Sequence, residues 1–150
     1  MTTLDLRFPP EVRSVLAELA RMLADAAPAA ILAHTRPPED EEPDFAELWL
    51  AGLHRGIDAD TDAARRLLDR PDFGQDPVDI AEDEALRALR GFAALRLALR
   101  ETALSALPDD SLETGKLDRR KLRAAQRHAY ACYAALGEIE GALCDVISGE

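Results

Sequence analysis

Cysteine is scarce in this sequence of 150 residues, which contains only two. Cys132 and Cys144 fall in one predicted helix, where twelve residues at about 1.5 Å each separate them by about 18 Å, beyond the reach of a disulfide. Two thiols cannot complete a four-thiolate zinc site, and no CxxC or HxxxH spacing occurs. We therefore expect neither a disulfide nor a bound metal.

Long hydrophobic runs are also absent. No stretch approaches the length of about eighteen apolar residues that a membrane-spanning helix needs, and the start, MTTLDLRFPPEV, lacks the features of a signal peptide. We expect a cytoplasmic protein without membrane contact.

Basic residues are fewer than acidic ones. The sequence has 18 Lys and Arg and 29 Asp and Glu, which gives a formal net charge of −11. This charge repels nucleic acids, so we do not expect a nucleic-acid partner for the chain as a whole.

The alternating pattern of a strand is almost missing. It occurs only in LDLRF, residues 4–8, so we expect residues 1–8 to form an extended arm or one edge strand. Elsewhere apolar residues recur at helical spacing. A chain of this length fits one hydrophobic core. We therefore predict a single all-α domain, residues 1–150, of about five helices.

The first predicted helix begins at Pro9 and Pro10, because proline suits the first turn of a helix, where its missing N–H is not needed. Its apolar residues form one stripe from Val12 to Ala26. The helix should stop near Pro28, with a short continuation possible through Ile31 and Leu32.

An acidic, proline-rich loop is predicted at residues 36–43, and a helix follows it. Asp44 and Glu47 have the spacing of a capping box, which marks the helix start. The loop acids Glu39, Asp40, Glu41 and Glu42 then either surround this start as solvated charges or contact a cation or a partner. One apolar face of the helix contains Phe45, Leu48, Trp49, Gly52, Leu53 and Gly56. Gly52 and Gly56 permit a close backbone approach or a bend, which we interpret as ordinary packing. We predict a separate short helix that starts near Asp58 or Asp60 and ends before Pro71.

Two long helices are predicted in the second half of the chain. The first starts where Asp79 and Glu82 repeat the capping pattern and ends near Leu107; a loop covers residues 108–115. The second begins near Lys116 and carries apolar residues at heptad spacing. The two rows of this repeat are Leu122, Ala129, Leu136 and Leu143, and Ala125, Cys132, Ile139 and Val146. We expect the two helices to pack antiparallel at the centre of a bundle-like fold.

Two arginines fall within the apolar face predicted for the first of these long helices. This face contains Leu86, Leu89, Phe92, Ala93, Leu97, Ala103, Leu104 and Leu107, and at 100° per residue Arg96 and Arg100 lie inside it. Burial of an unpaired guanidinium costs several kcal/mol, so each must meet a carboxylate, bind an anion or reach out to water. Glu140, at the edge of the apolar rows of the last helix, is the natural carboxylate partner. Arg96, Arg100 and Glu140 are therefore our candidate binding residues.

The segment KLDRRKLRAAQRH, residues 116–128, is basic in an otherwise acidic chain. Arg119, Arg120 and Arg123 could contact phosphates, although the interleaved aromatic residues of a single-strand binder are missing, and a solvated face is the alternative. His128 lies one helical turn before Cys132. No third group nearby completes a nucleophilic arrangement, so we interpret Cys132 as a buried apolar residue.

Two segments carry a resemblance to a known family. EALRALRGFAALRLALRETAL and YACYAALGEIEGAL resemble the two C-terminal helices of an uncharacterised, mainly actinobacterial protein family, in which an Asn-Asp-Leu-Arg-Leu-type motif precedes a Tyr-x-x-Leu-Gly helix. Arg96 and Leu97 match the first motif, although Ala93 and Ala94 replace its polar pair, and Tyr133, Leu136 and Gly137 match the second. The resemblance covers about one third of the chain. It implies a helical fold and no particular chemistry.

No catalytic or cofactor motif stands out. The chain has no Gly-rich phosphate loop, HExxH sequence, serine nucleophile elbow or Glu-x-x-His pair, so we name no catalytic residue and no cofactor. The favoured function is a non-enzymatic module for protein interaction or regulation, with a protein partner or self-association. The alternatives are an anion-binding or enzymatic domain that uses Arg96 and Arg100, and a nucleic-acid module that uses residues 116–128.

Overall fold

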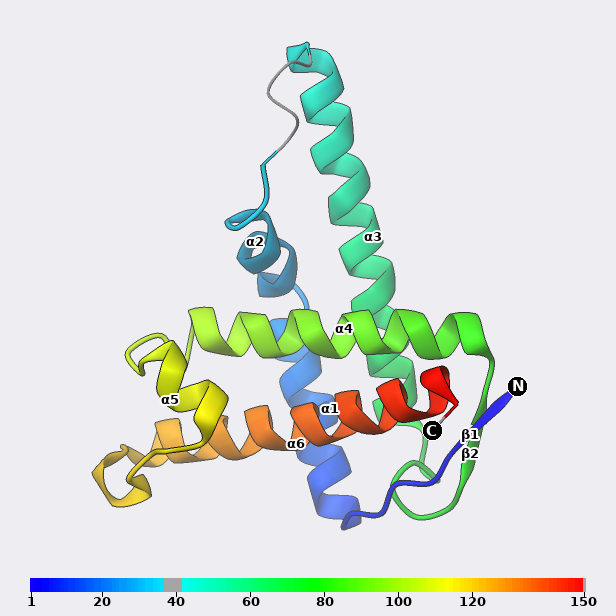
Figure 1. The fold of residues 1–150 in the computed structure, drawn as a ribbon, viewed down its shortest axis with the longest axis vertical. Helices are drawn as coiled ribbons and strands as arrows, with labels where there is room; N and C mark the ends of the chain where they lie inside the picture. The colour runs from blue at the N-terminus through cyan, green and yellow to red at the C-terminus, as the bar shows by residue number, and fades with distance from the viewer. Residues whose placement is uncertain (37–41, 150) are drawn as a thin grey trace.

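The computed structural model describes residues 1–36 and 42–149. The all-α prediction is confirmed: helices pack against one another, and one two-stranded sheet lies at the side (Figure 1). The elements are β1 Thr2–Leu4, α1 Pro10–Leu23, α2 Ala26–Leu32, α3 Pro43–Asp69, β2 Val78–Ile80, α4 Glu82–Glu101, α5 Asp109–Thr114, the 3-10 turn Arg119–Lys121 and α6 Ala124–Ser148. In this part of the chain, no helix combines the length and hydropathy needed to cross a membrane.

Helices α4 and α6 lie side by side in opposite directions, as predicted (Figure 1). Their contact is apolar, because Phe92, Leu95 and Leu99 of α4 and Leu136 and Leu143 of α6 are all almost completely buried. Helices α1, α2 and α3 also contact α4. Helix α4 is therefore the centre of the core.

The buried face of α4 is not the one predicted from its large residues. The structure buries Ala85, Ala88, Gly91, Phe92, Ala94, Leu95, Ala98 and Leu99, whereas Leu86 is 42% exposed and Ala93 is exposed. The reason is the approach of α3. A Cβ on Gly91 would overlap the backbone carbonyl of Asp60 and lie 2.9 Å from Cβ of Ala64. Small residues are needed on this side because the two helix backbones nearly touch.

Helix α3 is continuous, so the prediction of two separate helices over residues 44–56 and 58–70 is wrong. Pro43 is its first residue, and no side chain caps its N-terminus, so Asp44 lies in the first turn and forms no capping box. Gly52 and Gly56 do not interrupt the helix, and neither has a positive φ. The predicted acidic loop thus ends one residue early, and its acids Glu39, Asp40 and Glu41 lie outside the described residues.

The predicted N-terminal arm contains a strand that is part of a sheet. Strand β1 pairs antiparallel with β2, with Thr2 opposite Ile80 and Leu4 opposite Val78. The pairing buries the side chains of all of these except Thr2. Strand pairing explains why Asp79 does not cap a helix: Asp79 lies in β2, opposite Thr3, and Ala81 precedes the first turn of α4.

Other predicted helix boundaries also differ from the structure. The first helix ends at Leu23 and not near Pro28, whereas the predicted continuation through Ile31 and Leu32 is the end of α2, which contains Pro28. Helix α4 ends at Glu101, six residues before the predicted end. The connection at residues 108–115 contains α5, which starts after Pro108 and ends at the left-handed Gly115. The last helix begins at Ala124 and not at Lys116, because the basic residues before it form the 3-10 turn.

Candidate functional site

The predicted internal pair between Arg96 and Glu140 is present. Nη1 of Arg96 lies 3.1 Å from Oε2 of Glu140, and the two side chains are only 27% and 20% exposed. The Arg96 Nε–H donates to the carbonyl oxygen of Tyr133 at 3.3 Å, and the guanidinium carbon stands 4.1 Å from the centre of the Tyr133 ring. Gly137 makes room for this arrangement, since a Cβ there would lie 3.0 Å from Nη2 of Arg96. The guanidinium therefore joins α4 to α6.

Arg100 finds a different partner from the one expected. Its Nη2 lies 2.7 Å from Oδ1 of Asp109 and 4.0 Å from Oε1 of Glu113, both on α5. The hydrogen bond to Asp109 raises the pKa of Arg100 above its usual value, although partial burial acts in the opposite direction. Glu140 therefore pairs with Arg96, whereas Arg100 pairs with α5, a helix that was not predicted from the sequence.

Neither arginine presents a free charge to an anion. A shallow pocket of about 340 Å³ does include Arg100, together with His34, Leu97, Glu101 and Asp109. Two of these residues are carboxylates, and one of them already holds the guanidinium. Their negative charge opposes the binding of an anion at this place. The role of Arg96, Arg100 and Glu140 as ligand-binding residues stays a prediction, and the structure favours internal pairing instead.

The basic segment before α6 does not form one cluster. Arg119 lies over the ring of Tyr130, with its guanidinium carbon 5.6 Å from the ring centre. Arg120 pairs with Asp118 at 3.3 Å. The backbone N–H of Arg123 donates to Oε1 of Gln126 at the start of α6. The three side chains are exposed but have separate local roles, and phosphate contact by them stays a prediction.

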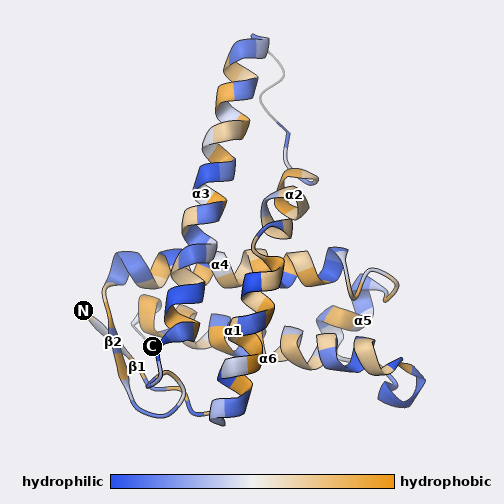
Figure 2. Cartoon of the chain, turned by 180° about the vertical axis from the view of Figure 1, so that it is seen from behind, coloured by the Kyte–Doolittle hydropathy of each residue, from blue (hydrophilic) through white to orange (hydrophobic). Residues whose placement is uncertain are grey.

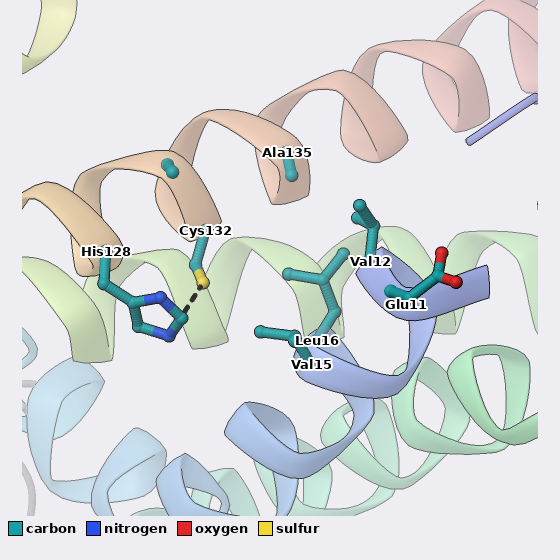
Figure 3. Close-up of a pocket in the computed structure, with 8 residues that line it drawn as sticks. Glu11, Val12, Val15, Leu16, His128, Cys132 and Ala135 are labelled. Carbon is teal, nitrogen blue, oxygen red and sulfur yellow. Dashed lines mark hydrogen bonds between the residues drawn. The ribbon is translucent and has the colours of Figure 1, made fainter. Parts of the chain in front are cut away.

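An apolar pocket of about 290 Å³ lies between α1 and α6 (Figure 3). Figure 3 shows Val12, Val15 and Leu16 of α1 facing His128 and Cys132 of α6; Glu11, Ala131 and Ala135 complete the lining. The Cys132 sulfur lies 3.9 Å from Nε2 of His128. The sequence placed this pair one turn apart but gave no sign that α1 would close a pocket around it.

The pocket between α1 and α6 is lined mainly by apolar groups. Burial raises the pKa of the Cys132 thiol, which lowers the fraction present as the reactive thiolate. The other cysteine, Cys144, is exposed, and both are free. Among the described residues, no three His, Cys, Asp or Glu side chains lie close enough together to hold a metal ion.

An exposed apolar surface lies on α3. Its first half rises beyond the layer formed by α4 and α6, with α2 beside it (Figure 1), and hydrophobic residues continue along this projecting part (Figure 2). Phe45 is 45% exposed and Leu48 is 70% exposed. We call the surface formed by Phe45, Leu48, Trp49, Gly52, Leu53 and Gly56 the arm face. A groove of about 430 Å³ runs along it from Leu48 to Asp60.

Among the described residues, no backbone approaches the two glycines of the arm face closely. A Cβ on Gly56 would meet no atom within 4 Å, and one on Gly52 would meet only the mobile end of the Arg55 side chain, at 3.8 Å. Glycine inside a helix costs about 1 kcal/mol relative to alanine. Gly91, by contrast, is required by the contact with α3. The close backbone approach that was expected at Gly52 and Gly56 is therefore not made by any described residue.

Comparison of the chain with protein-family models, curated proteins and solved structures finds no match. The resemblance of the α4 and α6 segments to an uncharacterised actinobacterial family therefore stays a prediction.

Proposed function

We propose that the protein is a non-enzymatic module that binds another polypeptide through the arm face of α3. The observation that carries this proposal is the apolar surface of the exposed Phe45 and Leu48 and the half-buried Trp49 on a helix that projects from a well-packed body. Exposed apolar patches of this kind mark interaction surfaces, because burying them releases hydration free energy. The expected cytoplasmic location belongs to the same proposal.

The arm face has the spacing of a helix that binds another helix. Phe45, Leu48, Trp49 and Leu53 follow one another at intervals of three and four residues, which puts them on one side. A hydrophobic helix face pairs well with the face of a second helix or with an apolar groove. The separation of the arm from the α4–α6 contact means that a partner can bind there without disturbing the core.

The alternative of an anion-binding or enzymatic domain is less well supported. Arg96 and Arg100 are engaged by Glu140 and Asp109, and the pocket around Cys132 is lined mainly by apolar groups. A substrate anion would have to displace Glu140 from Arg96 or Asp109 from Arg100 before it could bind. The arm face needs no such change before it binds.

The test is a photo-reactive amino acid placed on the arm face in living cells. At position 48 it should give a discrete cross-linked product, because a bound polypeptide would cover this side chain. At position 47, on the opposite side of the same helix and equally in reach of random collisions, no such product should form. Equal cross-linking at both positions, or none at position 48, would contradict the proposed function.

A further inference from the structure

We infer that the arm face is the contact surface of a symmetric dimer, in which a second copy of this chain lays its α3 antiparallel across the first. This inference rests on the proposed function and names the partner. Three observations select a second copy over an unrelated polypeptide: the position of the glycines, the distribution of charge along the flank of the arm, and the extent of the groove.

The glycines favour an identical partner. Gly52 and Gly56 have open space where side chains would be, so a second helix can approach the α3 backbone closely at this level only. A close approach needs small residues on both helices. An identical helix that crosses near Gly52 supplies them, with the same residues facing each other across the two-fold axis.

The charges favour the antiparallel arrangement. At 100° per residue, Asp44 and Arg55 lie on the same flank of the arm face, eleven residues apart. An antiparallel two-fold pair brings the same flanks of both helices together. With the crossing near Gly52, Arg55 of each copy then lies on the same side as Asp44 of the other, about 7.5 Å from its level along the helix axis, a distance that the long arginine side chain can span. A parallel pair would instead place this flank against the opposite one, formed by Leu50, Leu53 and Ile57, and leave both charges without a partner.

The groove has the length that this arrangement needs. It continues from Leu48 past Gly56 to Asp60, at the base of the arm. With the crossing near Gly52, Phe45 of the second copy reaches the level of Gly56 to Asp60. The tip of each arm thus fills the lower part of the groove on the other. An interface of one half-helix per copy is small, so the dimer should dissociate on dilution.

Sedimentation equilibrium over a wide range of concentrations tests the dimer. The unchanged chain should move from monomer to dimer as its concentration rises. Leu48→Glu should abolish this change, whereas Leu86→Glu, the same substitution at an exposed leucine of α4, should leave it intact. A monomer at every concentration, or a dimer that Leu48→Glu does not affect, would overturn the inference.

Gly56→Ala separates this interface from a general loss of structure. The dilute protein should melt at a higher temperature, because alanine favours the helix and its Cβ meets nothing in the monomer. Association should nevertheless weaken by about tenfold or more, because the methyl group holds the two helices apart. Unchanged association would contradict the close approach at Gly56.

Cysteine cross-linking distinguishes the two orientations. In a Cys144→Ser background, chains with Phe45→Cys mixed with chains with Ala59→Cys should form a mixed disulfide in the antiparallel dimer, because residues 45 and 59 are opposite each other when the helices cross near Gly52. Phe45→Cys alone should cross-link only in a parallel one, since antiparallel crossing separates the two copies of residue 45 by about 20 Å. Efficient cross-linking between the two copies of residue 45 would overturn the antiparallel arrangement.

If the chain stays monomeric but the photo-reactive group at position 48 gives a face-specific product with another polypeptide, the proposed function stands and the dimer does not. If neither product nor dimer forms, both fail.

Discussion

Gly91→Ala is expected to lower the free energy of unfolding by about 3 kcal/mol. The added Cβ would overlap the carbonyl of Asp60 and crowd Ala64, both on α3. Backbone atoms cannot rotate away as a long side chain can, so α3 and α4 would have to separate along their contact. Urea unfolding followed by circular dichroism measures the change.

The control for this substitution is Gly141→Ala on α6. A Cβ at Gly141 meets no atom within 4 Å, so alanine there should stabilise the protein by about 0.5–1 kcal/mol through its helix propensity. The two substitutions add the same atom to the middle of a helix and should have effects of opposite sign. A Gly91→Ala protein as stable as the unchanged one would show that α3 and α4 do not approach as closely as described.

Arg96→Met is expected to lower the free energy of unfolding by about 2 kcal/mol, because it leaves the largely buried Glu140 carboxylate without its partner. It also removes the hydrogen bond to the Tyr133 carbonyl and the contact with the Tyr133 ring. The matched control is Arg66→Met. Arg66 pairs with Glu84 on the surface, with 59% and 34% of the side chains exposed, so its loss should cost less than about 1 kcal/mol.

A double-mutant cycle separates the ion pair from the packing around it. The combination of Arg96→Met with Glu140→Leu should destabilise the protein less than the sum of the two single changes, because it leaves no unpaired charge behind. Thermal melting at equal protein concentration measures all four proteins. An unchanged or raised melting temperature for Arg96→Met would contradict a structural role for this pair.

Helical periodicity was sufficient to predict the fold class and the antiparallel pairing of the two long helices, but not which side of α4 is buried. The prediction followed the large residues and therefore included Leu86 and Ala93, which are exposed. Packing depends on shape as well as hydrophobicity, and the buried alanines and Gly91 suit a neighbour that comes very close. The identity of that neighbour, α3, is a tertiary property that periodicity does not contain.

Short elements were missed because local signals are weak over few residues. Strand β2 has only three residues and becomes visible through its pairing with β1, more than seventy residues earlier in the chain. Helix α5 was also missed, because its six residues after Pro108 were predicted as part of a loop. In both cases long-range contacts decide a local structure.

The contacts of the candidate site residues were also predicted only in part. A cation inside an apolar pattern is a clear signal, which is why the Arg96–Glu140 pair could be predicted from spacing alone. The partner of Arg100 could not, because Asp109 reaches it through the unpredicted α5. The apolar face of α3 was visible in the sequence, but only the structure shows that Phe45 and Leu48 on it are exposed in the described part of the chain. An amphipathic pattern identifies an apolar face and leaves open what packs against it.

Trp49 allows the most direct test of the association of two arm faces. It is the only tryptophan of the chain, and it lines the groove on α3. If two copies associate through this surface, its fluorescence emission should shift to shorter wavelength as the protein concentration rises, and Leu48→Glu should keep the spectrum of the dilute protein throughout. An emission maximum that stays constant from dilute to concentrated solution in the unchanged chain would contradict the arm-face dimer.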